Sequence, residues 1–586
     1  MIRINDHKQQ NLFDPWHFLS PKRRRMLDES WPGLFREHLL CELPVDQLRP
    51  FLREDFGAPS KELYTLLGVL LLQQMMDLTD TKALEQLSFN IQWHYALNIT
   101  EESDSAKYIS EKTLWHWRQI LIEQRLDQLI FDQISTKLAK VFNVKTGLQR
   151  IDSTHIKSNM RRLGRIAIFS HTIFKFLTNL KRHHQDLFAT LSAALVDRYA
   201  TQKALKAFAM VKPSASGKTL AQVSTDLYEL IEQFKGQKAV ARMHSYKLMQ
   251  RVLTEHCVVQ SDGDNRRVAV KKPKDVPTDS LQNPSDPDAA YSGYKGQGYQ
   301  VQVMETFTRG KDDPQEKPRL NLITHVAVEK ANAQDADALI PAIAASAQRG
   351  IKPDMVLADT LYGSDDNAQQ AKGADSDPVA PVKDGQNGSS STGMRLCDFT
   401  FDDSGRVVRC PVGRRPANVR YKKKTKRFTA RFDREHCRSC PEVDACPIKP
   451  GKKYYYLWYS EKNYRLSRRR QFEARDEFVD LYRWRAGVEA TMSQYDRLTG
   501  VKRLRVVGLK AVRFCATLKA TGLNILRAAA VRGRQRKPHD AKTGALGPAF
   551  MLFSIIKEPI GRWWPNIMKK LPPRFAGAYG TIILAA

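Results

Sequence analysis

Three acidic residues that lie far apart in the chain occur in patterns that could bring them together. Asp152 lies in a short, partly β-branched run, Asp359 directly follows the apolar run 355–358, and Glu489 lies in a helical pattern. Carboxylate oxygens are the ligands that Mg²⁺ prefers. Two such ions about 4 Å apart can activate an attacking oxygen and stabilise a leaving one. These residues therefore predict a two-metal site for phosphate chemistry.

Strand patterns predict that two of these carboxylates lie at one end of a sheet. The run LQRIDSTHIKS predicts a strand that ends at residues 152–154, and DMVLADTLYGS predicts a strand buried on both faces, with Asp359 at its carboxyl end. Ligands of open α/β sheets bind at the carboxyl ends of strands. Asp354 precedes the second strand, and Asp365 and Asp366 lie beyond the following turn, so Asp359 is the preferred ligand.

The glutamate belongs to an amphipathic helix, which we expect to cover residues 463 to 498. Apolar residues recur there every three or four positions and predict a core-facing stripe of Leu481, Trp484, Val488, Met492, Tyr495 and Leu498. Tyr482, Arg485 and Glu489 form a second stripe with the same spacing at the edge of the buried face. Glu489 can then point along the end of the sheet, and Arg485 can hold a phosphate by a bidentate contact.

The chain as a whole predicts a mixed α/β (α+β) protein of several units. The expected units are an N-terminal helical domain over residues 1–145, the first part of the catalytic core over 146–364 with a helical insertion over about 165–255, a linker and a basic, cysteine-containing β-rich insertion over 365–460, the end of the core with the Glu helix over 461–535, and a C-terminal tail over 536–586. The N-terminal helices could bind DNA, or they could serve packing or dimerisation.

Composition points to a nucleic-acid-binding protein of a reducing compartment. The 94 Lys and Arg residues exceed the 63 Asp and Glu residues by 31 and are spread along the chain, which favours a polyanionic partner. Hydrophobic residues make up 42%, enough for real cores. The N-terminus lacks a secretory signal, no apolar run is long enough to span a bilayer, and eight cysteines do not make a disulfide framework. We expect a cytoplasmic protein.

Four of the cysteines could bind a metal. Cys410, Cys437, Cys440 and Cys446 could form a closed tetrahedral site for a structural Zn²⁺ ion. Only one tight Cys-x-x-Cys pair is present, so reduced cysteines that pack a small β insertion are the alternative. The basic runs YKKKTKR at 421–427, RLSRRR at 465–470 and VKRLRVVGLK at 501–510 are candidate DNA contacts, and a solvated surface is the alternative for each.

Three segments of the chain resemble bacterial insertion-sequence transposases of the Asp-Asp-Glu (DDE) type. They are IDST at 151–154, ADTLYGS at 358–364 and YRWRAGVEATMSQYDRLTGVKRLRVVG at 482–508, and the Tyr-x-x-Arg-x-x-x-Glu signature of one group matches Tyr482, Arg485 and Glu489. Residues 60–118 are similar to the helical domain that precedes the catalytic core in that family. Where the family has a basic residue after the glutamate, this chain has Asp496 followed by Arg497.

The resemblance implies a fold, an activity and a set of site residues. It implies a ribonuclease-H-like core in which Asp152, Asp359 and Glu489 bind Mg²⁺ or Mn²⁺, and DNA contacts from Tyr482, Arg485, Arg497, Lys502 and Arg503. The activity would be cleavage at the ends of the element and attack of the 3′-hydroxyls on target DNA. The partners would be double-stranded DNA carrying terminal inverted repeats and target DNA, bound by a homodimer in the synaptic complex. The protein would lie in the bacterial cytoplasm, at the nucleoid.

Two other functions remain open at this point. A ribonuclease-H-like nuclease without strand transfer would need the same three carboxylates. A DNA-binding protein with a vestigial core would not, and the presence of all three argues against it.

Overall fold

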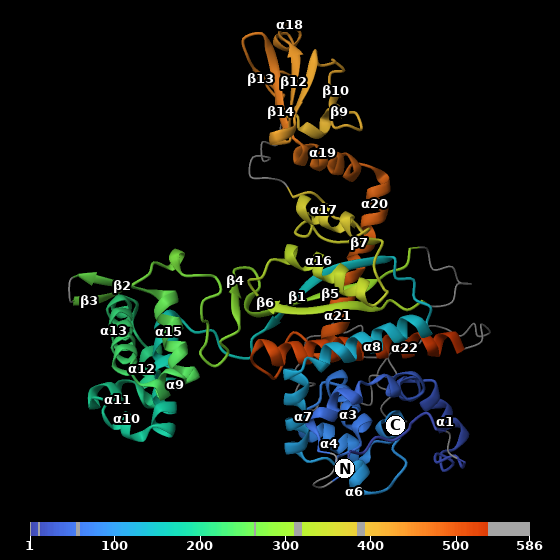
Figure 1. The fold of residues 1–586 in the computed structure, drawn as a ribbon, viewed down its shortest axis with the longest axis vertical. Helices are drawn as coiled ribbons and strands as arrows, with labels where there is room; N and C mark the ends of the chain where they lie inside the picture. Colours follow the sequence, from blue (N-terminus) through green and yellow to red (C-terminus); the bar gives the residue numbers. More distant parts are fainter. Residues whose placement is uncertain are drawn as a thin grey trace, which may run out of the picture. The chain divides into compact units, whose positions relative to one another are not determined.

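The computed structural model describes residues 2–9, 12–53, 59–262, 265–309, 319–383 and 393–536. The expected C-terminal tail, beyond residue 536, lies outside the described residues. The predicted mixed α/β class is confirmed by a mixed sheet and many helices (Figure 1). None of the helices in the described part of the chain combines the length and apolar character needed to cross a membrane.

Helices form the N-terminal part of the chain. They are α1 (Pro21–Asp28), α2 (Trp31–Leu34), η1 (Phe35–Leu39), η2 (Leu40–Glu42), η3 (Val45–Phe51), α3 (Leu63–Met75), α4 (Asp80–Phe89), α5 (Ile91–Ala96), α6 (Asp104–Lys107), α7 (Glu111–Glu123) and α8 (Leu126–Val141). Helix α3 is apolar on all sides, and nearly all of its residues are buried. A helix with that pattern has to be surrounded by other elements.

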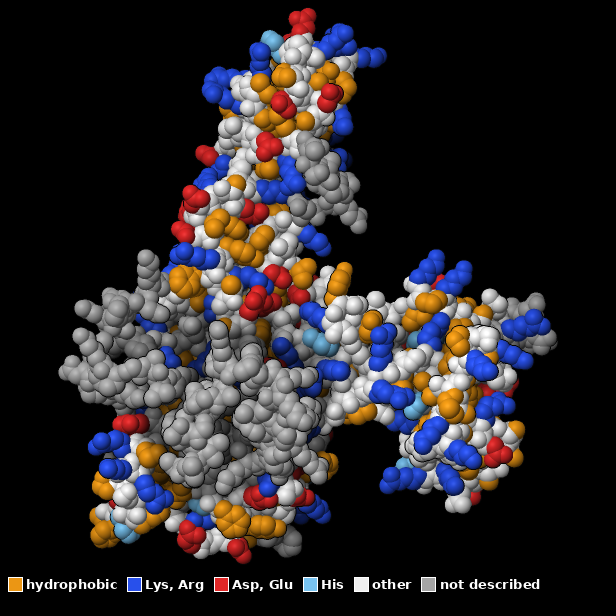
Figure 2. Space-filling view, turned by 180° about the vertical axis from the view of Figure 1, so that it is seen from behind, with side chains coloured by type: hydrophobic (Ala, Val, Ile, Leu, Met, Phe, Trp, Pro, Cys, Tyr) orange, Lys and Arg blue, Asp and Glu red, His pale blue; other side chains and the backbone are white. Residues whose placement is uncertain are grey.

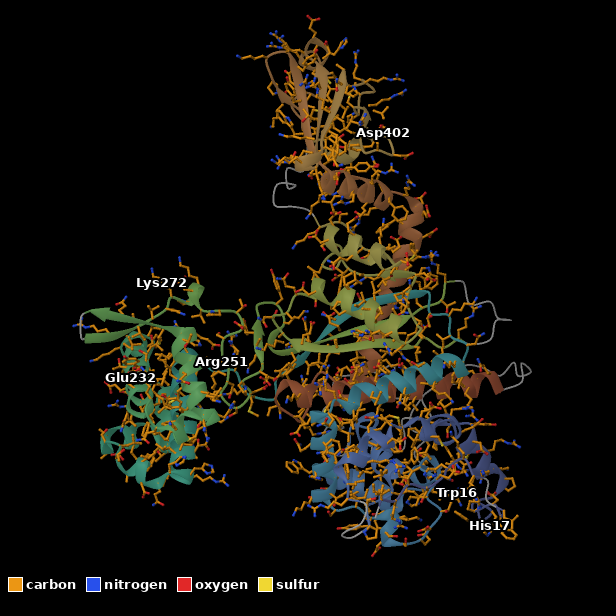
Figure 3. The ribbon with its side chains drawn as sticks, in the orientation of Figure 1. Trp16, His17, Glu232, Arg251, Lys272 and Asp402 are labelled. Carbon is orange, nitrogen blue, oxygen red and sulfur yellow. The ribbon has the colours of Figure 1, made fainter. Side chains whose placement is uncertain are left out.

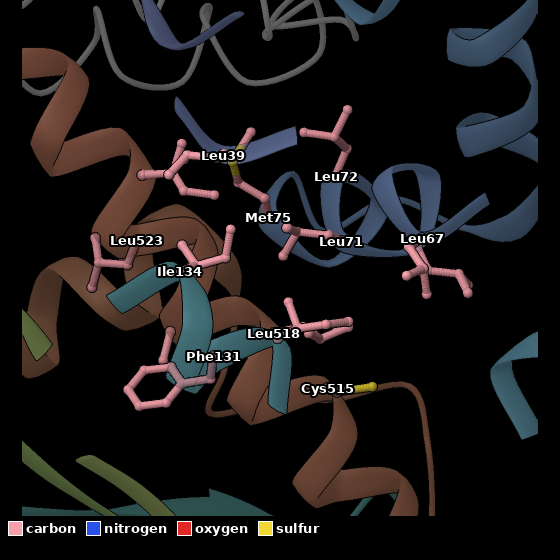
Figure 4. Packing of buried hydrophobic residues seen from close by; sticks show 14 of the residues in the cluster. Leu39, Leu67, Leu71, Leu72, Met75, Phe131, Ile134, Cys515, Leu518 and Leu523 are labelled. Atoms are coloured by element: carbon pink, nitrogen blue, oxygen red, sulfur yellow. The ribbon is translucent and has the colours of Figure 1, made fainter. Parts of the chain in front are cut away.

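The long helix α22 (Leu509–Arg536) packs against α3 and α8, far from it in sequence (Figure 4). A Cβ atom at Gly522 would lie 2.6 Å from Cβ of Met75, so glycine permits the close approach of α22 to α3. The same cluster of buried residues includes Ile156 and Val303 of the sheet and Val488 near Glu489. One continuous core therefore joins the N-terminal helices to the catalytic elements.

The central sheet carries the first two candidate carboxylates. Its strands are β1 (Leu148–Lys157), β4 (Ala290–Ser292), β5 (Gly296–Thr306), β6 (Ile323–Lys330), β7 (Met355–Leu357) and β8 (Asp377–Val379). Strand β5 pairs antiparallel with β1, β4 and β6, whereas β7 pairs parallel with β1, and β8 parallel with β7. The turn η6 (Asp335–Ala338) and helix α16 (Leu339–Gln348) connect β6 to β7.

Two expectations about this sheet were wrong. Strand β1 does not end at residues 152–154 but runs on to Lys157, because it keeps its pairing with β5 as far as Gly298. The expected linker also contains regular structure, since helix α17 (Asp365–Gly373) and strand β8 follow the turn after β7. Ser364 caps α17, whose small residues Ala368 and Ala371 are buried. Residues 365–373 therefore form a helix although their small and polar composition predicted a linker.

A helical segment with its own core separates β1 from β4. It comprises α9 (Arg165–His183), α10 (Gln185–Ala189), α11 (Ala193–Tyr199), α12 (Gln202–Ala209), η4 (Pro213–Ala215), α13 (Ser216–Phe234), α14 (Lys238–Ala241) and α15 (His244–His256), followed by the hairpin β2 (Cys257–Asp262) and β3 (Asn265–Val270) and the turn η5 (Pro273–Asp275). Arg251 of α15, labelled in Figure 3, donates to the carbonyl oxygens of Asp279 and Pro287. These bonds tie α15 to the loop that leads to β4.

A second insertion is rich in strands. It contains η7 (Leu396–Asp398), β9 (Thr400–Phe401), β10 (Val407–Arg409), β11 (Asn418–Lys422), η8 (Lys423–Thr425), β12 (Arg427–Asp433), α18 (Arg434–Arg438), β13 (Lys449–Pro450) and β14 (Tyr454–Ser460). Four of these strands form one sheet in the order β11-β12-β14-β13, and β9 and β10 form a separate two-stranded sheet.

The expected helix over 463–498 is in fact interrupted. It is divided into α19 (Glu461–Glu473), α20 (Asp476–Tyr482), η9 (Arg483–Ala486) and α21 (Gly487–Thr499). Arg475 has an extended backbone and separates α19 from α20. The predicted apolar stripe is largely correct, since Leu481, Val488, Met492 and Tyr495 are buried, whereas Leu498 is 37% exposed.

Candidate active site

Parallel pairing of β1 with β7 brings Asp152 level with Asp359. Arg150 pairs with Leu357 in this ladder, so the residues two positions further along each chain are Asp152 and Asp359. Neighbouring strands lie about 4.8 Å apart, and paired positions share a face of the sheet. The ladder ends at Leu357, two residues before Asp359, but the charge of Asp359 raises the pKa of Asp152, so the two carboxylates lie near each other.

The surroundings of Asp152 disfavour its negative charge. Burial raises the pKa of this carboxyl, and the nearby Asp359 and Asp335 raise it further, while Arg485 acts in the opposite direction. Asp152 Oδ2 accepts a hydrogen bond from Arg485 Nη2 at 2.8 Å. Asp359 Oδ1 accepts one from the backbone N–H of Leu361 at 2.8 Å, which fixes the turn after β7. A half-buried group of like charges is an environment that favours a cation.

Glu489 lies in the first turn of α21, beside the same arginine. Arg485 Nη1 is 3.8 Å from Glu489 Oε1, so a single guanidinium lies between Asp152 and Glu489. Both carboxylates line one open cavity of about 380 Å³, together with Ser153, Thr154, Met492, Ser493, Asp496, Arg497 and Lys502. The Glu489 side chain is 73% exposed and can reach into this cavity.

A buried polar network anchors the start of α21 to the sheet. Arg150 donates to Glu305 Oε1 at 2.8 Å and to the carbonyl oxygen of Trp484 at 2.6 Å. Glu305 Oε2 accepts from Thr491 Oγ1 at 2.6 Å and from Arg527 Nη1 at 3.0 Å. The Glu305 side chain is fully buried. Because a half-satisfied buried charge is costly, this network holds α21 in one position over β1 and β5.

Sequence reasoning missed a second group of polar residues next to Asp152. Lys295 Nζ contacts Ser153 Oγ at 3.0 Å, Gln300 Oε1 at 2.9 Å and Asp335 Oδ2 at 3.2 Å. Asp335 opens the short turn η6 and is buried. The available signal was the alternation of Gln300 and Gln302 with apolar Val301 and Val303 in a buried strand, because buried amides need polar partners.

Two of the five expected DNA-contact residues line the cavity. Arg497 and Lys502 line it, and Arg503 is exposed. Arg485 is paired with carboxylates rather than open to a phosphate. Tyr482 stacks on Phe478, with ring centroids 5.2 Å apart. Asp496, which stands where a basic residue was expected, accepts from the backbone N–H of Lys502 at 3.1 Å and so fixes the turn after α21.

The four cysteines of the β-rich insertion line one small cavity of about 90 Å³. The backbone N–H of Arg414 donates to Cys410 Sγ at 3.3 Å, and Gly413 in this turn has φ +84. Burial raises the pKa of Cys437 to about 11, and the neighbouring Cys446, Cys410 and Cys440 contribute to the rise. All four are free thiols. Across the described residues, no three His, Cys, Asp or Glu side chains are arranged as a metal-binding group.

Comparison with known families identifies the protein class. The family described as "Transposase domain (DUF772)" matches residues 36–120, and the family described as "Transposase DDE domain" matches residues 409–529, which include Glu489 and Arg485. No curated protein matches the chain. Transposases bind DNA, and DDE transposases generally use divalent metal ions. Both matches are to transposase domains, so the chain is a transposase with a DDE catalytic domain, which cleaves DNA and transfers its strands.

Proposed function

We propose that Asp152, Asp359 and Glu489 bind the divalent ions, Mg²⁺ or Mn²⁺, with which this transposase cuts DNA at the ends of its own element. The proposal is supported by the β1–β7 register, whose last pair, Arg150 with Leu357, lies two residues before Asp152 and Asp359, and by the guanidinium of Arg485 between Asp152 and Glu489. All donors are carboxylate oxygens, as hard divalent ions require. The order of strands around them supports a ribonuclease-H-like core.

Arg485 has two roles in this proposal. With no ion bound, it balances the charge of Asp152, which is only 17% exposed. Ions bound to the carboxylates would balance their charge in place of Arg485, and its guanidinium could then bind a phosphate oxygen of the DNA. Bound ions would lower the pKa of the attacking water or 3′-hydroxyl and stabilise the leaving oxygen. Arg497, Lys502 and Arg503 would hold the DNA backbone beside the cavity.

The DNA substrates would be the terminal inverted repeats of the element and a target duplex. Two ends have to be held together before both can join one target, so we propose a homodimer in the synaptic complex. We also propose that Cys410, Cys437, Cys440 and Cys446 bind a structural Zn²⁺ ion, since their side chains line the same small cavity. That ion would stabilise the β-rich insertion and take no part in DNA cleavage.

Cleavage of a labelled duplex that carries the terminal repeats tests the proposal. Asp152→Asn, Asp359→Asn and Glu489→Gln should each abolish Mg²⁺-dependent cutting and strand transfer but keep DNA binding. Asp366→Asn is the matched control, because this aspartate lies near Asp359 in sequence but its side chain is 78% exposed and faces Lys462 at 4.0 Å. Retained cleavage by any of the three variants would remove that residue from the site.

A further inference from the structure

We infer that one face of the four-stranded sheet β11-β12-β14-β13 binds unpaired nucleotides of the DNA substrate. The inference rests on the proposed function, since it takes DNA as the ligand and adds a second contact surface outside the cavity. We call this surface the aromatic face. It consists of Arg420 and Lys422 of β11, Arg427, Thr429, Arg431 and Asp433 of β12, Lys449 of β13, and Tyr454, Tyr456 and Trp458 of β14.

The two faces of this sheet have different surroundings. Side chains alternate along each strand, so Phe428, Ala430 and Phe432 point to one side and pack with Leu457 and Tyr459 in a core. The residues between them, such as Arg427 and Arg431, point to the other side. No core cluster within the described residues contains the side chains of the aromatic face.

Aromatic rings form a row along β14 on this face. Tyr456 and Trp458 have nearly parallel rings, at 3° and with centroids 5.5 Å apart. Trp458 is 56% exposed, although a tryptophan is usually among the more buried residues. Arg431 lies 6.0 Å from the ring centroids of both Tyr454 and Tyr456. The exposed ring of Trp458, in line with the half-buried rings of Tyr454 and Tyr456, offers a surface on which bases can stack.

Positive charges stand directly beside this row. In the strand register, Arg431 of β12 pairs with Tyr456 of β14. Thr429 pairs with Trp458 on one side and with Arg420 on the other. Arg427 lies two residues before Thr429 and therefore on the same face. Residues 409–460 contain fifteen Lys and Arg but four Asp and Glu. Lys and Arg side chains are spread over this insertion at the top of Figure 2. Cations next to stacking rings suit a ligand that alternates phosphates with bases.

The chemistry favours unpaired over paired DNA. In a duplex the faces of the bases are covered by their neighbours, so an aromatic ring on a sheet has no base face to contact. Proteins that bind single strands combine a basic surface with aromatic side chains, and each stacked base is worth about 1–3 kcal/mol. An acidic peptide could use the cations but would leave the row of rings without a role.

Binding measurements on the full chain test the inference without cleavage. Fluorescence anisotropy without added Mg²⁺ or Mn²⁺ and without a chelator, on an Asp152→Asn background, would compare a labelled 20-nucleotide single strand with the corresponding duplex. Adding Trp458→Ala should weaken single-strand binding about tenfold and change duplex binding less than twofold. Trp458→Phe, which keeps a ring, should restore most of the affinity. A 2-aminopurine base in the strand should change its fluorescence on binding, and Trp458→Ala should remove that change.

One control and one further variant make the result specific. Phe18→Ala removes another exposed ring, 58% exposed beside Trp16 and His17 (Figure 3), and should leave single-strand binding unchanged. Arg420→Glu with Arg427→Glu should weaken binding and reduce the salt dependence, by a slope of about 0.7 per lost phosphate contact. Equal single-strand affinity of Trp458→Ala and its parent would overturn the inference, as would an equal loss for the duplex or a preference for an acidic peptide.

These outcomes are separate from those of the cleavage test. If Asp152→Asn cuts DNA normally, the proposed metal site fails while the binding comparison still stands. If the three carboxylate variants lose cleavage but Trp458→Ala binds single strands normally, the metal site stands and the aromatic face fails.

Discussion

Replacing Gly487 by alanine tests how the Glu489 helix is held. Gly487 begins α21 with an ordinary helical backbone, φ −64 and ψ −15, so alanine would normally stabilise the helix by about 1 kcal/mol. Here its Cβ would lie 2.1 Å from Arg150 Nη1 and 2.7 Å from Arg150 Cζ. Normal carbon contacts lie at about 3.5 Å, so the guanidinium would have to move by more than about 1 Å.

The cost of that movement exceeds the gain in helix propensity. The Arg150 side chain is 7% exposed, and it bonds both the fully buried Glu305 and the carbonyl oxygen of Trp484. Losing the bond to Trp484 costs about 1–3 kcal/mol, and breaking the buried ion pair about 3–5 kcal/mol. We therefore expect a net destabilisation of about 2 kcal/mol or more. A displacement of about 1 Å at Glu489 would also slow cleavage about 100-fold.

Thermal or urea unfolding and the terminal-repeat cleavage assay measure both effects. Gly217→Ala is the control, because Gly217 lies in the first turn of α13 with no atom within 4 Å of the added Cβ. This change should leave stability unchanged or raise it by up to about 1 kcal/mol. The reasoning is refuted if Gly487→Ala raises the unfolding midpoint as Gly217→Ala does and cleaves at the wild-type rate.

Three further predictions concern other parts of the molecule. Burial lowers the pKa of His325 from 6.5 to about 4, so the unfolded chain binds a proton at a higher pH than the folded chain does. The free energy of unfolding therefore falls as the pH drops from 6.5 towards 4, by at most about 3 kcal/mol. In His325→Phe, the urea midpoint should fall less between pH 7 and pH 4.5 than it does in the wild-type chain. An equal fall in both proteins would contradict this prediction. Asp127→Ala should destabilise the chain by about 3 kcal/mol, because it leaves Arg513, 16% exposed and 3.1 Å from this buried carboxylate, without its charged partner; an unchanged melting temperature would count against this. Purified protein should contain one Zn²⁺ per chain by elemental analysis, and Cys437→Ser should lose it; a metal content unaffected by this substitution would exclude the site.

The part of the site that could be predicted from sequence depends on local spacing. The Tyr482, Arg485 and Glu489 stripe follows from helical periodicity, and the structure indeed places Arg485 within ion-pair distance of Glu489. Asp359 follows a buried strand, as the apolar run before it indicates. Each of these features lies within one strand or about one or two helical turns, so the local pattern of residue types is sufficient to predict it.

Long-range partners could not be predicted in this way. The pairing of Arg485 with Asp152 joins residues 333 positions apart, and nothing in either local pattern indicates it. The same holds for Lys295, whose contacts to Asp335 and Ser153 arise from the order of strands in the sheet. The break at Arg475 and the turn η9 also escaped prediction, because helical periodicity continues across them.

The most direct test is a count of bound ions by electron paramagnetic resonance. A catalytically arrested complex of the transposase with non-cleavable terminal-repeat DNA would be titrated with Mn²⁺. The wild-type chain should bind two Mn²⁺ ions whose spectra show mutual coupling, as expected for ions about 4 Å apart, and Asp152→Asn, Asp359→Asn and Glu489→Gln should each lose that coupled signal. Coupled Mn²⁺ that persists in all three variants, or none in the wild-type complex, would contradict a metal site built from these carboxylates.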